Sequence, residues 1–173
     1  TTYTCQSYEF RKYFSSITPE QHSILRSKGL NQEKVALLIR SDDVLSFQKV
    51  HSSTNLNLDT KINSNYENCE FSERNPSLIE YSALFGAVNV FKYLLLNGAT
   101  LTENLSQFAV TGGNYEIIHI LEQNGSKFNN LSALNKAIKF HRNELVEYIN
   151  ESLDVDFSIE SLRKSLKFYN LSI

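Results

Sequence analysis

The sequence predicts an all-α fold in which antiparallel helix pairs stack side by side as a solenoid. One pattern, a small residue followed by a turn residue, an apolar pair and a leucine, occurs at residues 82–94 and again at 109–121. A third copy lies at residues 137–149 and a weaker one at 36–45. The apolar residues within each copy follow helical spacing. Internal repetition on this scale is typical of helical arrays, most of which bind other molecules.

Boundary signals divide each copy into an inner and an outer helix. Ser77, with Glu80 three residues later, forms a capping box that predicts the start of one inner helix. Residues 161–171 have the pattern of a further inner helix. The remaining signals are the inner-helix starts Asn104 and Ser132 and the left-handed caps of two outer helices, Gly98 and Gly125.

The region before the repeats is predicted to be a helical cap formed by residues 1–30. Its helix starts at Thr18-Pro19-Glu20-Gln21, which combines an N-cap, a proline at the first helical position and a polar third residue. A stacked array needs its first apolar flank covered, so this segment is expected to pack there. The repeat array follows at residues 31–173, with units expected at about 31–75, 76–103, 104–131 and 132–157 and a partial unit at 158–173.

A resemblance to a known family is carried by residues 86–98, which read Gly-Ala-Val-Asn-Val-Phe-Lys-Tyr-Leu-Leu-Leu-Asn-Gly. This stretch resembles the turn and second helix of an ankyrin repeat. Residues 39–44, 75–86 and 116–121 are similar to a group of divergent ankyrin-like proteins of unknown function, abundant in some parasitic protists. The resemblance implies an ankyrin-like solenoid in which inner helices and β-hairpin fingers border a protein-binding groove.

The sequence departs from the ankyrin pattern in its repeat lengths. Turn positions are predicted at Arg40, Gly86, Gly113 and His141, which are 46, 27 and 28 residues apart, whereas the family period is about 33. The short units predict shortened β-hairpin fingers, reduced to tight turns. The usual Thr-Pro-Leu-His tetrapeptide is also absent.

The long first spacing predicts an inter-repeat loop at residues 51–75. Two interpretations of this loop remain open, a packed structural segment and a direct partner contact. Packing is favoured by its apolar residues, which are Leu56, Leu58, Ile62, Tyr66 and Phe71.

The resemblance also implies candidate partner-binding residues, because the last two residues of an ankyrin inner helix usually face the groove. They form an apolar stripe that becomes basic toward the C-terminus, and an exposed apolar stripe is typical of protein-binding surfaces. Burial of the same side chains under the loop or the neighbouring turns is the alternative. The candidates are Ile39, Leu84, Phe85, Thr111, Lys139, Phe140 and Lys167.

Composition argues against several other classes of function. The net charge of −2 lacks the basic excess of a nucleic-acid binder, and no apolar run is long enough for a membrane span. Cys5 and Cys69 are far apart, so two free thiols in a reducing, cytoplasmic setting are expected. The absence of Met suggests a fragment of a longer protein.

No motif for catalysis is recognised in the sequence. It contains no phosphate-binding glycine loop, no nucleophile elbow and no zinc-binding helix, so no enzyme activity, catalytic residue, metal, cofactor or small-molecule substrate is expected. We therefore expect a protein-interaction module with an unidentified protein partner. The alternatives are a structural spacer domain within a larger protein and, less favoured, an unrecognised enzyme.

Overall fold

The computed structural model describes residues 18–62, 67, 75–126, 130–153 and 158–172. The predicted all-α class is confirmed, because these residues form ten helices and no β-strand. The helices are α2 Pro19–Lys28, α3 Lys34–Arg40, α4 Val44–Thr54, α5 Leu78–Phe85, α6 Val88–Leu96, α7 Leu105–Gly112, α8 Tyr115–Gln123, α9 Asn130–Lys139, α10 Asn143–Leu153 and α11 Ile159–Lys167.

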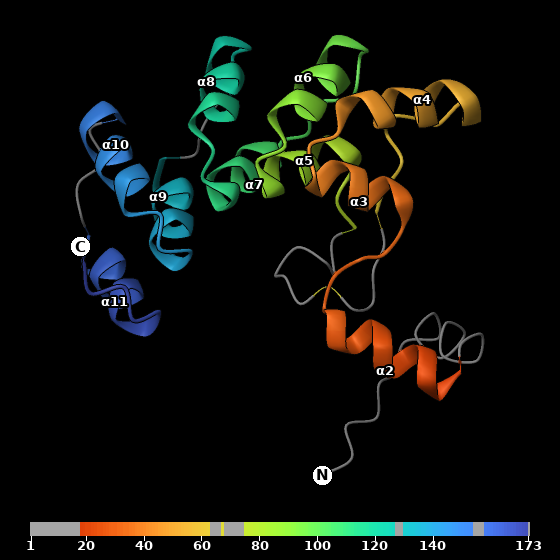
Figure 1. Cartoon of the computed structure of the whole chain (residues 1–173). Helices are drawn as coiled ribbons and strands as arrows, with labels where there is room; N and C mark the ends of the chain where they lie inside the picture. The colour runs from red at the N-terminus through yellow and green to blue at the C-terminus, as the bar shows by residue number, and fades with distance from the viewer. Residues whose placement is uncertain (1–17, 63–66, 68–74, 127–129, 154–157, 173) are drawn as a thin grey trace.

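The helices from α3 onward form two rows (Figure 1). The inner row runs α3, α5, α7, α9 and α11, and each of these helices packs on the next. The outer row runs α4, α6, α8 and α10, and each outer helix packs on the inner helix before it in the chain. The β-hairpin fingers are not seen. In the described ranges the β pairing is limited to one isolated bridge between Lys61 and Ser77.

The hydrophobic core lies between the two rows and between neighbouring inner helices. Small residues allow the inner helices to approach closely, and Ala83, Ala109 and Ala137 are all completely buried. The outer helices bury their apolar residues in the same core, as their helical spacing predicts. The buried outer-helix residues of α6, α8 and α10 are Val90, Phe91, Leu94, Ile117, Ile118, Leu121, Leu145, Val146 and Ile149.

Both predicted capping boxes are present. At the start of α5, the backbone N–H of Ser77 donates to Glu80 Oε2 over 2.8 Å, and the N–H of Glu80 donates to Ser77 Oγ over 3.4 Å. Thr18 and Gln21 form the same arrangement at the start of α2. Asn104, in contrast, precedes α7 without a side-chain cap.

Two predicted helix starts are wrong by two or three residues. The helix α9 begins at Asn130 rather than Ser132, and α11 is capped by Ser158, whose hydroxyl accepts from the N–H of Ser161. Ser161 is fully buried in the first turn of α11, where its hydroxyl is hydrogen-bonded to that of Ser158 over 3.1 Å.

A left-handed residue ends each inner segment and sets the register of the repeats. Gly86, Gly113 and His141 have φ values of 67°, 75° and 55°, as expected for the predicted turn positions. The prediction of Arg40 is wrong, because Arg40 is the last residue of α3 and Asp42 has the left-handed conformation, with φ 51°. Aspartate is one of the few residues that tolerate this conformation. The first unit is therefore shifted by two residues, and Arg40 occupies the position of Leu84.

Side-chain hydrogen bonds tie each turn to the turn before it. Asn114 donates to the carbonyl of Gly86 over 3.5 Å, and Arg142 donates through Nε to the carbonyl of Thr111 over 3.1 Å. Asn170 continues the series with a 3.0 Å bond to the carbonyl of Ile138. These bonds fix the relative positions of the inner-helix ends.

The turn at Asp42 carries the strongest of these links. Its carboxylate accepts from the backbone N–H groups of Asn89 and Val90 over 3.1 and 2.9 Å, and also from the Asn89 side chain over 2.8 Å. Those N–H groups belong to the first turn of α6, where the helix dipole favours a negative charge.

Replacing Asp42 with Gly is expected to lower the free energy of unfolding by about 1 kcal/mol. Glycine keeps the left-handed turn without strain, so this loss isolates the missing cap on α6. Asp42→Asn, which retains one acceptor, is the matched control and is expected to lose less. Urea unfolding followed by circular dichroism measures both variants, and equal losses would contradict the role of the carboxylate.

The predicted loop packs against the array where it is described. Leu56 and Leu58 are half-buried and Ile62 is 4% exposed, which confirms packing for these three residues. Asp59 accepts from the N–H of Thr100 over 2.9 Å and so joins the loop to the connection after α6. Residues 51–54 belong to α4, and Tyr66 and Phe71 lie outside the described residues.

The helix α2 contains no buried residue. Its apolar side chain Ile24 is 55% exposed. Residues 1–17 lie outside the described ranges, so the capping role of residues 1–30 stays a prediction.

Candidate functional site

The C-terminal ends of the inner helices lie in one register along the inner row. The residue just before each left-handed turn is Phe85 in α5, Gly112 in α7, Phe140 after α9 and Phe168 after α11. Consecutive inner helices pack on one another, so these positions follow each other from helix to helix. The residues one position earlier are Leu84, Thr111, Lys139 and Lys167.

Two of the predicted site residues are not available at this surface. Ile39 is completely buried in the core, so the prediction that it is exposed is wrong. The two-residue shift of the first unit explains this difference, because the exposed Ser41, and not Ile39, lies just before the left-handed turn. Thr111 is only 5% exposed, and its hydroxyl donates to the carbonyl of Gln107 over 2.8 Å.

The other predicted residues remain accessible to different degrees. Phe85 is 36% exposed, Lys167 is exposed, and the rest are half-buried, namely Leu84, Lys139 and Phe140. Gly112 lies between the aromatic positions of α5 and α9 and contributes no side chain. The surface therefore has two parts: an aromatic patch, formed by the exposed ring of Phe85 over the buried side chain of Tyr81 and the largely buried side chain of Arg40, and a basic groove between α9 and α11.

The aromatic patch rests on a buried polar network that links α3, α5 and the loop. Arg40 lies 5.8 Å from the ring centroid of Phe85, and the rings of Phe85 and Tyr81 are 4.6 Å apart. Below them, Arg40 donates to Tyr81 Oη over 2.6 Å and to Glu67 Oε1 over 3.3 Å. The Tyr81 hydroxyl in turn donates to Glu67. The network holds the exposed ring of Phe85 in place.

Glu67 is the member of this network that comes from the long loop. Its side chain is 4% exposed, and its carboxylate also accepts from the N–H of Asn31 over 3.0 Å. Burial raises the pKa of the Tyr81 phenol well above its ordinary value, and the adjacent Glu67 carboxylate acts in the same direction. The Tyr81 hydroxyl therefore stays protonated at neutral pH and serves as a donor.

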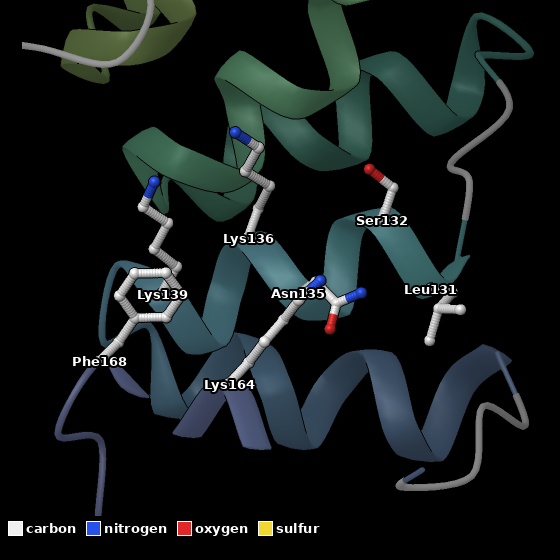
Figure 2. A pocket seen from close by; sticks show the side chains of 7 residues that line it. All are labelled: Leu131, Ser132, Asn135, Lys136, Lys139, Lys164 and Phe168. Carbon is white, nitrogen blue, oxygen red and sulfur yellow. The ribbon is translucent and has the colours of Figure 1, made fainter. Parts of the chain in front are cut away.

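The basic groove is a hollow of about 460 Å³ between α9 and α11 (Figure 2). Its lysines come from both helices, two from α9 and one from α11, and they face the hollow together with an asparagine amide and an aromatic ring. The lining residues are Leu131, Ser132, Asn135, Lys136, Lys139, Lys164 and Phe168.

Aromatic rings hold the lysines at the groove. Lys139 Nζ lies 5.6 Å from the ring centroid of Phe140 and 5.2 Å from that of Phe168, so it bridges the two helices. Lys167 lies 5.6 Å from the Phe168 centroid, and Lys136 lies 6.0 Å from that of Phe140. Such cation–π contacts contribute about 0.5–1 kcal/mol each at exposed sites. They orient the lysines without neutralising their charge.

Sequence reasoning missed the groove residues Asn135, Lys136 and Lys164. A signal for the lysines was present, because the pair Lys136 and Lys139 recurs in register as Lys164 and Lys167. Asn135 carried no such signal. Its Oδ1 is buried and has no hydrogen-bond partner among the described residues.

The chain was compared with known families and proteins. The model of a family described as a domain of unknown function (DUF3447) matches residues 96–173, from the last residue of α6 onward. Neither the curated proteins nor the solved structures contain a match to this chain. The comparisons therefore assign part of the chain to a family pattern and leave its activity to be argued from the surface.

The described residues include no group of three or more His, Cys, Asp or Glu side chains arranged to hold a metal ion. Within them, no helix has both the length and the apolar composition that crossing a bilayer requires.

Proposed function

We propose that this protein is an ankyrin-like solenoid that binds a segment of a partner protein along the ends of its inner helices. The observation that carries the proposal is the shared register of the accessible side chains Phe85, Lys139, Phe140 and Lys167. The inner helices α5, α9 and α11 present them on one edge, and α7, between α5 and α9, contributes no accessible side chain there. Aromatic side chains are enriched at the centres of protein-binding surfaces.

The arrangement of the helices supports the ankyrin-like part of the proposal. An inner and an outer row, joined in each unit by a left-handed turn, is the geometry that the resemblance implies. The tight connections in place of fingers would leave the inner helices as the main contact surface. A cytoplasmic location and a purely binding role without a catalytic step are parts of the same proposal.

A display selection with random 16-residue peptides tests the proposal. We expect enriched peptides whose affinity falls about tenfold in Phe140→Ala, while the melting temperature changes by less than about 3 °C because Phe140 is only half-buried. Leu96→Ala is the matched control, since Leu96 is 85% exposed on the outer helix α6. Fluorescence anisotropy of the labelled peptides measures the affinities.

Two outcomes would contradict the proposal. If no peptide is enriched over an unrelated helical protein, the alternative of a structural spacer is favoured. If Phe140→Ala lowers the melting temperature strongly and leaves peptide affinity intact, Phe140 is a core residue and the binding surface lies elsewhere.

A further inference from the structure

The basic groove between α9 and α11 indicates the chemistry of the bound segment. We propose that it takes an extended acidic stretch of the partner, whose carboxylates contact Lys136, Lys139 and Lys164. This inference rests on the proposed function and adds the class of partner to it.

Charge is the first argument for an acidic segment. Three lysines from two helices line one hollow, and none of its lining residues is acidic. Within the described part of the chain, Lys164 makes no ion pair. An incoming carboxylate is able to pair with the Lys164 ammonium, and ammonium–carboxylate hydrogen bonds are stronger than neutral ones. The arrangement therefore favours an anion over a neutral or cationic ligand.

The walls of the groove are the second argument. Leu131 at one end and the ring of Phe168 at the other give the hollow an apolar lining beside its charges. An acidic peptide with one apolar side chain among its carboxylates matches this mixture. A free inorganic anion would leave the apolar walls uncovered.

The distribution of charge favours a short acidic peptide over a nucleic acid. The whole chain has a net charge of −2, and the outer helix α10 carries Glu144, Glu147 and Glu151 exposed to solvent. A long polyanion needs a continuous basic path, whereas a few carboxylates need only the groove.

The test uses a fluorescein-labelled peptide, acetyl-Gly-Glu-Asp-Glu-Leu-Asp-Glu-Gly, and its analogue with Gln and Asn in place of the acids. We expect the acidic peptide to bind at least tenfold more tightly than the analogue. Raising NaCl from 50 to 300 mM should weaken its binding severalfold, because salt screens the ion pairs. Anisotropy gives both affinities.

Charge variants locate the binding to the groove. Lys136→Gln combined with Lys164→Gln is expected to weaken the acidic peptide at least tenfold, and Lys136→Arg with Lys164→Arg is expected to retain most of the affinity. Lys49→Gln, on the outer helix α4, is the matched control and should leave it unchanged. Circular dichroism verifies that each variant is folded.

The opposing outcomes separate this inference from the proposed function. Equal binding of the acidic peptide and its analogue would overturn the inference. Stronger binding of a ten-nucleotide single strand than of the peptide would also overturn it. A third contrary outcome is that the selected peptides lose affinity on substitution of Phe85 and keep it on substitution of the lysines. The last result would still support the proposed function. Failure of every peptide to bind would overturn both.

Discussion

Arg40→Met is expected to lower the free energy of unfolding by about 3 kcal/mol, because it leaves the buried carboxylate of Glu67 without its cation. The side chains of Arg40 and Glu67 are only 12% and 4% exposed, so solvent does little to replace the lost interaction. Methionine retains much of the arginine volume, and the loss therefore reports on charge and hydrogen bonds. The carbonyl of Asn31 also loses its donor, which lies 2.5 Å away.

A double-mutant cycle with Glu67→Gln tests this expectation. The double variant should lose clearly less than the sum of the two single losses, because the amide carries no charge to strand. Urea unfolding followed by circular dichroism gives the three free energies. Arg26→Met on α2 is the matched control, since Arg26 is exposed and should cost less than about 0.5 kcal/mol. Additive losses, or a loss at Arg40 as small as that of the control, would contradict the role of the network.

The same network has a consequence for the surface above it. Arg40 and Tyr81 support the ring of Phe85, so their loss should also weaken peptides that depend on Phe85. Peptides held by the basic groove should be unaffected, because that groove lies on α9 and α11. The two parts of the surface are thus separable by mutation.

Helix positions were predictable because local rules determine them here. The spacing of apolar residues in α6 and α8, the Ser77–Glu80 capping box and the glycine turns at Gly86 and Gly113 each depend on a few neighbouring residues. The turn of the first unit was predicted wrongly for the same reason. This turn has no glycine, and aspartate is a weaker signal of a left-handed residue than glycine is.

The surface was less predictable because it depends on contacts between distant residues. Glu67 lies in a polar stretch, and only the folded chain brings it to Arg40, 27 residues earlier in the sequence. The burial of Ile39 likewise follows from the register of the first unit, in which the left-handed residue lies two residues later than the sequence predicted. The lysine pairs were recognisable from the repeat, but their convergence on one hollow requires the packing of α11 on α9.

Gly112→Ala is expected to destabilise the protein by about 2 kcal/mol, although alanine is the better helix former by about 1 kcal/mol. An added Cβ would lie 2.2 Å from the carbonyl oxygen of Ala83 and 2.9 Å from that of Leu84. Both are backbone atoms of α5, so the clash is relieved only if α5 and α7 separate. The closeness of these helices is the reason for the gap in side chains between Phe85 and Phe140.

Gly125→Ala is the matched control for this prediction. Gly125 has a left-handed φ of 73° with no atom within 4 Å of an added Cβ, so its cost is backbone strain of about 1 kcal/mol. The larger loss at Gly112, which lies within α7 without that strain, would therefore measure the helix contact alone. Urea unfolding compares the two variants. A Gly112→Ala variant as stable as the original chain would mean that α5 and α7 are not held at this distance, and the continuous surface built from their ends would lose its support.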